Sequence, residues 1–206
     1  MYLLVVNGTE HEIESPGNVC LGFCLFDGSY PAYDKPPVQL SIPYAEIRAR
    51  TPRPKEELQK DLGSISGDIE AVNKQLSHVR EPLDKLTDEQ WLRCRHKLIE
   101  LVEQLDNIPG ISVSVATKIL HRQFPHLLPI VDELCVRVKH GYKGRIGDIL
   151  DSIRRDMILS ESTIDEALSF LSQRLKGVTL TRVRVFDIFL WAIMNADNKE
   201  IRIVQS

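Results

Sequence analysis

The sequence predicts a mainly α-helical protein that begins with a small β-hairpin. Apolar residues recur at helical spacing through most of the chain after residue 54. The first residues are instead β-prone and contain Asn7-Gly8, the favoured two-residue signal for a hairpin turn. Between these parts lies a segment rich in Gly and Pro, in which apolar residues follow neither the helical spacing nor the alternation of a strand. We therefore expect an N-terminal β-hairpin and loop region, residues 1–54, and a helical domain, residues 55–206.

The composition is that of a soluble globular protein. The chain has 206 residues, 43% of them hydrophobic and 27% charged, which is enough for a sizeable core. Its net charge of −3 excludes a global attraction to nucleic acid, so any such attraction needs a local patch. The four cysteines lack metal-ligand spacing and are expected to be reduced. We expect a cytoplasmic protein with no membrane partner, because no apolar run suits a signal peptide or a membrane span. The sequence does not indicate the oligomeric state.

Two strands are expected at the N-terminus, Tyr2 to Val6 and Thr9 to Ile13, joined by a type I′ turn. The following residues 14–44 are expected to form a long loop with short extended pieces, because Gly and Pro interrupt every apolar run. Aromatic side chains stand between these breakers, namely Phe23, Phe26, Tyr30 and Tyr33.

Three amphipathic helices are expected in the middle of the chain. Thr87 and Gln90 have the spacing of a capping box, and an apolar face runs from residue 91 to residue 105. Two more apolar stripes at helical spacing cover residues 146–157 and 164–175.

The last expected helix, residues 182–196, is apolar almost all round and therefore belongs at the centre of a bundle. Asp187 within it needs a partner if it is buried, and Arg182 or Arg184 could form that structural ion pair. Residues 199–206 alternate and could add a strand to the N-terminal hairpin.

A short turn, Ile108 to Ser112, separates two helices within residues 95–123. Its amides and those that open the next helix can face outward together and hold a phosphate, with help from the helix dipole. Gly110 permits backbone conformations that other residues avoid, so the phosphate can come close. Contacts of this kind bind nucleic acid without reading its sequence.

The stretch "IPGISVSVATKIL" resembles the helix-hairpin-helix of the endonuclease III and MutY-type DNA glycosylase superfamily, whose usual form is Leu-Pro-Gly-Val-Gly-x-Lys/Ser-Thr-Ala. Ser112 stands in the place of the second glycine, and Ser114 stands in the Lys/Ser place. Asp132, 18 residues after Ser114, falls where the superfamily has its catalytic aspartate. The resemblance covers residues 95–145. The chain also resembles uncharacterised bacterial proteins with an "IPG…ATK.LH…P.IDE" core.

This resemblance implies a helical bundle of the glycosylase type that binds DNA and hydrolyses a base–sugar bond with Asp132. It implies a monofunctional enzyme, because Ser114 replaces the lysine that forms a Schiff base in lyase-competent members. It implies no metal and no iron–sulfur cluster, since no cysteine follows Cys135. The one bound ion that it leaves open is a monovalent cation held by the backbone of the hairpin.

Basic residues around the hairpin give a local positive zone. Residues 118–145 carry a net charge of +4, and the expected DNA-binding residues are Gly110, Ser112, Ser114, Lys118, Lys139, Lys143 and Arg145. Two alternatives stay open. Asp132 could serve only as a helix N-cap in a non-catalytic DNA-binding module. The hairpin could also be a plain structural turn in a protein-interaction module.

Overall fold

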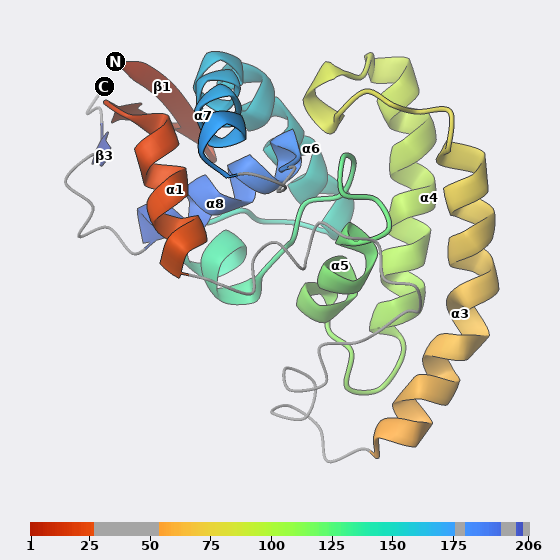
Figure 1. The fold of residues 1–206 in the computed structure, drawn as a ribbon. Helices are drawn as coiled ribbons and strands as arrows, with labels where there is room; N and C mark the ends of the chain where they lie inside the picture. Colours follow the sequence, from red (N-terminus) through yellow and green to blue (C-terminus); the bar gives the residue numbers. More distant parts are fainter. Residues whose placement is uncertain (27–53, 176–179, 195–200, 204–206) are drawn as a thin grey trace.

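The computed structural model describes residues 1–26, 54–175, 180–194 and 201–203. It is mainly helical with a small N-terminal β-hairpin, as the sequence predicts (Figure 1). The elements follow in the order β1 (Tyr2–Val6), β2 (Thr9–Ile13), α1 (Pro16–Phe26), α3 (Lys55–Leu76), η2 (Leu83–Lys85), α4 (Asp88–Asp106), α5 (Val113–His121), η3 (Glu133–Lys139), α6 (Ile146–Leu159), α7 (Glu161–Arg174), α8 (Arg182–Met194) and β3 (Ile201–Ile203).

The sheet has three antiparallel strands in the order β1-β2-β3. Val6 pairs with Thr9 across a two-residue turn, in which Asn7 and Gly8 have φ angles of 48° and 76°. Two successive positive φ angles are what a type I′ turn requires, so the predicted turn is confirmed. The expected third strand is also confirmed, because β3 pairs with β2.

The expectation of a loop after the hairpin is wrong for residues 16–26, which form α1. Pro16 suits the first position of a helix, and the amide of Gly17 donates to a carboxylate oxygen of Glu166 on α7 at 3.1 Å. A Cβ at Gly17 would lie 2.3 Å from the Phe170 ring, so glycine allows close approach of α7. Tertiary packing thus outweighs the weak helix propensity of a glycine-containing segment. Phe23 and Phe26 belong to this helix. Tyr30 and Tyr33 lie outside the described residues.

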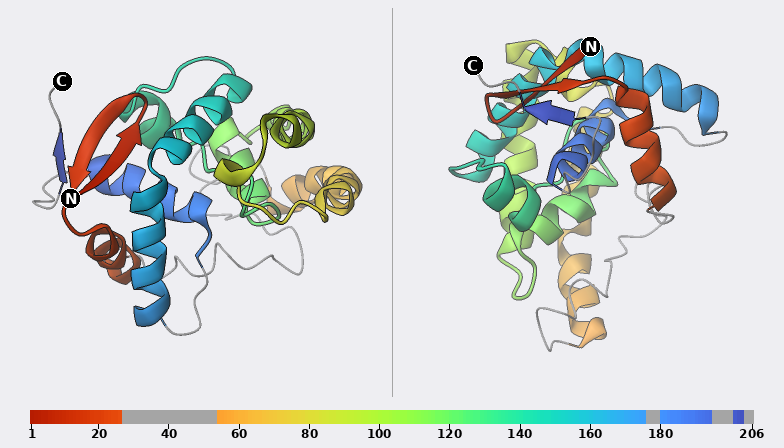
Figure 2. Two further views of the ribbon diagram at one scale, coloured as in Figure 1. Left: turned by 90° about the horizontal axis from the view of Figure 1, so that it is seen from above. Right: turned by 90° about the vertical axis from the view of Figure 1, so that its left-hand side faces the viewer.

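The described helices and the hairpin share one hydrophobic core, which runs from Leu4 to Ala192. Figures 1 and 2 show α3 and α4 side by side along one edge of the molecule, and β1, α1 and α7 at the opposite edge. Helix α8 lies between these groups, and every residue from Arg182 to Leu190 is buried. The prediction of a central apolar helix is therefore confirmed. The partner of Asp187 in that helix is Arg184, whose Nη1 lies 3.6 Å from the carboxylate.

Two arginines join η2 to the later helices. Arg154 of α6 donates to the carbonyl oxygen of Leu86 at 2.6 Å and to the Asp88 carboxylate at 2.9 Å. Arg182 of α8 donates from Nε to the buried Asp84 carboxylate at 2.8 Å and from Nη1 to Asp165. These contacts fix the α3–α4 side of the molecule against α6, α7 and α8.

Candidate functional site: the α4–α5 hairpin and Asp132

The predicted turn between two helices is present at residues 107–112. The amide of Ile111 donates to the carbonyl oxygen of Ile108 at 2.9 Å, and both side chains are buried. Gly110 has a φ angle of +92°, a region that residues with a Cβ rarely adopt. Ser112 has an extended conformation directly before α5, and its side chain does not cap that helix.

Asp132 is the N-cap of η3, a single π-helical segment of residues 133–139. Its Oδ1 accepts hydrogen bonds from the amides of Leu134 at 3.0 Å and Cys135 at 3.1 Å. The N-cap role foreseen for this aspartate is therefore confirmed.

The second carboxylate oxygen of Asp132 faces α5. Ser114 Oγ donates to Oδ2 at 3.2 Å, and Lys118 Nζ lies 3.4 Å from the same oxygen. Ser114 and Lys118 stand one helical turn apart, so α5 presents both side chains on one face. The Asp132 side chain is 11% exposed and that of Lys118 is 19% exposed. The two sequence positions that carry the resemblance are thus in direct contact.

The net effect of these contacts is to lower the pKa of Asp132 below its ordinary value. Burial is the largest single effect and by itself would raise the pKa, because it disfavours the charged form. The hydrogen bond from the Cys135 amide, the charge of Lys118 and the hydrogen bonds from Lys118 and Ser114 oppose burial and prevail. The carboxylate is therefore ionised at neutral pH.

Thr117 holds the Asp132 segment in place, a role that the sequence analysis missed. Its Oγ1 accepts a hydrogen bond from the amide of Val131 at 3.0 Å and donates to the carbonyl oxygen of Val113 at 2.9 Å. Ser114, Thr117 and Lys118 share one face of α5 at helical spacing, which is the signal that could have identified Thr117.

The other expected DNA-binding residues lie apart from this buried cluster. Lys139, Lys143 and Arg145 are all exposed, at the end of η3 and in the segment before α6. Two apolar side chains of η3, Leu134 and Val138, are also exposed, at 53% and 63%. The buried carboxylate of Asp132 is thus followed along the chain by exposed apolar and basic side chains of η3 and of the segment before α6.

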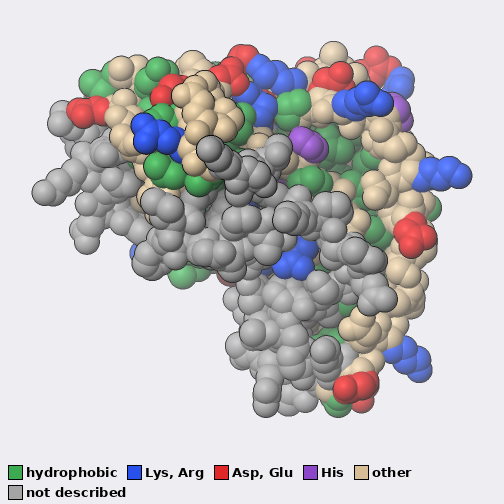
Figure 3. All heavy atoms as spheres, in the orientation of Figure 1, with side chains coloured by type: hydrophobic (Ala, Val, Ile, Leu, Met, Phe, Trp, Pro, Cys, Tyr) green, Lys and Arg blue, Asp and Glu red, His purple; other side chains and the backbone are tan. Residues whose placement is uncertain are grey.

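The described surface carries charges of both signs. Figure 3 shows basic and acidic side chains interspersed along α3 and across the top of the molecule in this view. This mixture agrees with the net charge of −3.

The remaining candidates for chemistry have structural roles. Trp91 and Tyr142 are buried, and their polar atoms donate to Asp151 at 2.8 Å and Asp156 at 2.6 Å respectively. Cys135 is a buried free thiol, as expected of a packing residue. Within the part of the chain that the structure describes, no group of three or more His, Cys, Asp or Glu side chains suits a metal ion. Nor does any helix there have the length and apolar character needed to cross a membrane.

Comparison with known proteins gives one match. Residues 58–194 match the model of DUF6308, a family of unknown function. No curated protein and no solved structure matches the chain. The matched residues include the α4–α5 hairpin, the Asp132 cluster and the central helix α8.

Proposed function

The chain belongs to the DUF6308 family of unknown function, and we propose that it is a DNA-binding protein that grips the phosphate backbone with the α4–α5 hairpin and uses Asp132 to hydrolyse a base–sugar bond. The contact of Asp132 with the hairpin helix through Ser114, at 3.2 Å, is the observation that carries this proposal.

The hairpin supports the binding half of the proposal. The amides that open α5 directly follow a turn in which Gly110 has a φ angle of +92°, and amides at a helix N-terminus can bind a phosphate. Lys139, Lys143 and Arg145 add exposed positive charge after η3. Contacts of this type bind phosphates and carry no sequence information.

The ionised state of Asp132 supports the catalytic half. Cleavage of a base–sugar bond passes through a cation-like sugar, which a carboxylate stabilises. The base leaves with the bonding electrons, water adds to the anomeric carbon, and the proton that the water loses neutralises the departing base. The lowered pKa keeps this charge available at neutral pH. The base must first leave the duplex stack, and exposed apolar side chains such as Leu134 suit contact with unstacked bases.

A non-catalytic DNA-binding module is the second candidate. It is favoured by the burial of Asp132, since both carboxylate oxygens already accept hydrogen bonds from Leu134, Cys135 and Ser114. In this case the aspartate would only stabilise the packing of η3 against α5 through these hydrogen bonds.

Binding is tested first, with a short duplex at increasing salt. The logarithm of the binding constant should fall linearly with the logarithm of salt concentration, and Lys143→Gln should reduce that slope by about 0.9 for one lost phosphate contact. Lys74→Gln, an exposed lysine of α3, is the matched control and should leave the slope unchanged. A slope near zero for the wild-type protein would exclude both candidates and leave the protein-interaction module.

Catalysis is tested by release of free base from DNA that carries damaged or modified bases. Asp132→Asn should bind the duplex as the wild type does and release no base. Release that persists in this variant contradicts the assigned role of Asp132. Binding without release by the wild-type protein, across a panel of substrates, supports the non-catalytic module.

A further inference from the structure

A pocket of about 530 Å³ lies between the end of α3, the segment of residues 77–82 and the first turns of α4. Its volume is within the range of small-molecule sites. It is distinct from the Asp132 site, because none of its described lining residues contacts Asp132.

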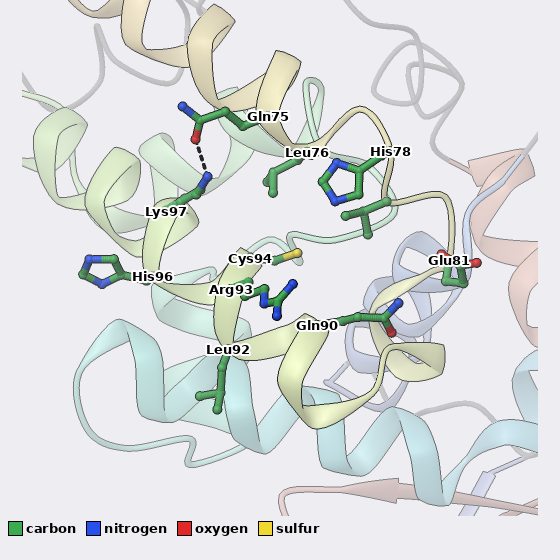
Figure 4. A pocket seen from close by; sticks show the side chains of 11 residues that line it. Gln75, Leu76, His78, Glu81, Gln90, Leu92, Arg93, Cys94, His96 and Lys97 are labelled. Atoms are coloured by element: carbon green, nitrogen blue, oxygen red, sulfur yellow. Dashed lines mark hydrogen bonds between the residues drawn. The ribbon is translucent and has the colours of Figure 1, made fainter.

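The floor of the pocket is apolar. Leu76 and Cys94 are 6% and 1% exposed, and Figure 4 shows both side chains directed into the space between α3 and α4. Val79, partly buried, adds to this floor. Burial raises the pKa of the Cys94 thiol, with a smaller opposing effect from Lys97, so the sulfur is neutral and behaves as an apolar atom.

The rim of the pocket is mainly cationic. Its two fixed positive charges are Arg93 and Lys97 of α4, and Glu81 is the one acid among its described lining residues. His96 lies 3.1 Å from Glu100 and points away from Leu76 and Cys94 (Figure 4). Lys97 donates to the neutral amide oxygen of Gln75, so its charge is not cancelled by that partner (Figure 4).

Arg93 pairs with Glu89 across a surface where both side chains are at least 75% exposed. An exposed pair of this kind contributes little to stability, and an incoming anion can replace it at small cost.

From this arrangement we infer that the pocket binds a small amphipathic anion, with a ring-sized apolar body on Leu76, Val79 and Cys94 and one acidic group at Lys97 and Arg93. The apolar floor supplies affinity by burying the ring. The two cations fix the orientation and select negative charge. The inference does not depend on the proposed DNA binding.

The test uses 8-anilinonaphthalene-1-sulfonate, which has an aromatic body and one sulfonate. The native protein should bind one molecule per chain by calorimetry, and the probe should raise the thermal midpoint as its concentration rises. Lys97→Gln should weaken binding roughly tenfold, since loss of a charge-assisted contact is worth about one decade of affinity. Cys94→Met, which extends a side chain into the pocket, should weaken it by a similar factor.

Two matched variants separate this site from weaker explanations. Lys74→Gln removes the same charge from α3 outside the pocket, and Asp132→Asn alters the hairpin site. Both should bind the probe as the wild type does. Equal losses in Lys74→Gln and Lys97→Gln would mean a general charge effect and would overturn the inference. So would the absence of native-state binding, or full affinity in either Cys94→Met or Lys97→Gln.

Discussion

Removal of the Asp132 side chain should destabilise the protein far more than removal of its charge. In Asp132→Ala, η3 loses its N-cap, which typically costs about 1 kcal/mol. The buried hydroxyl of Ser114 and the ammonium of Lys118 also lose the Asp132 carboxylate as an acceptor, which adds about 2 kcal/mol. We therefore expect a free energy of unfolding lower by about 3 kcal/mol, or a thermal midpoint lower by about 6–12 °C for a chain of this length.

Asp132→Asn is the matched variant. Its side-chain oxygen can still cap η3, since Asn and Asp are comparable N-caps. It loses the charge of the ion pair with Lys118 but keeps an oxygen that can accept from Ser114 and Lys118, so the expected cost is about 1 kcal/mol. Both variants are compared with the wild type by urea unfolding at pH 7, followed by circular dichroism.

The pH dependence gives a second readout of the same contacts. Because the folded-state pKa of Asp132 is lowered, its charge stabilises the protein above its unfolded pKa of about 4. That contribution is lost as the pH falls through the lower folded-state value, and Asp132→Asn should lack this part of the acid sensitivity. Equal losses in Asp132→Ala and Asp132→Asn, or a loss below about 0.5 kcal/mol in Asp132→Ala, would refute the reasoning.

Three further predictions concern other contacts. Asp84→Ala leaves the buried Arg182 without its main partner and should lower the free energy of unfolding by about 3–5 kcal/mol, measured by urea unfolding with Asp84→Asn as the milder comparison. Gly110→Ala places a Cβ at φ +92° and should cost about 1–2 kcal/mol in the same assay, and a cost near zero would mean that the turn relaxes freely. Burial and the nearby His140 lower the pKa of His11, so the unfolded state gains its proton first as pH falls below about 6.5. Stability should therefore decline from pH 7 to pH 5, and the decline should be smaller in His11→Gln; an identical decline would contradict the assignment.

The helical elements were largely predictable because their signals are local. The Thr87–Gln90 capping box, the type I′ turn at Asn7-Gly8 and the apolar stripe of α6 depend on residues within one or two turns of each other. Helix α1 was not predictable in this way. It is stabilised by contact with α7, a helix about 150 residues later in the chain, and glycine matters there for the space it leaves.

Some features of the candidate site likewise depend on local sequence, and others depend on tertiary packing. The sequence by itself determined the turn at Gly110, the N-cap at Asp132 and the 18-residue spacing between Ser114 and Asp132, because each depends on residue type and local order. Only the tertiary structure decided that Ser114 and Lys118 point at one carboxylate oxygen and hold it ionised. The packing of α5 against the chain before η3 sets that distance, and no local pattern encodes the position of one helix against another segment. The pocket beside Cys94 has the same origin, since it exists only where α3 and α4 meet.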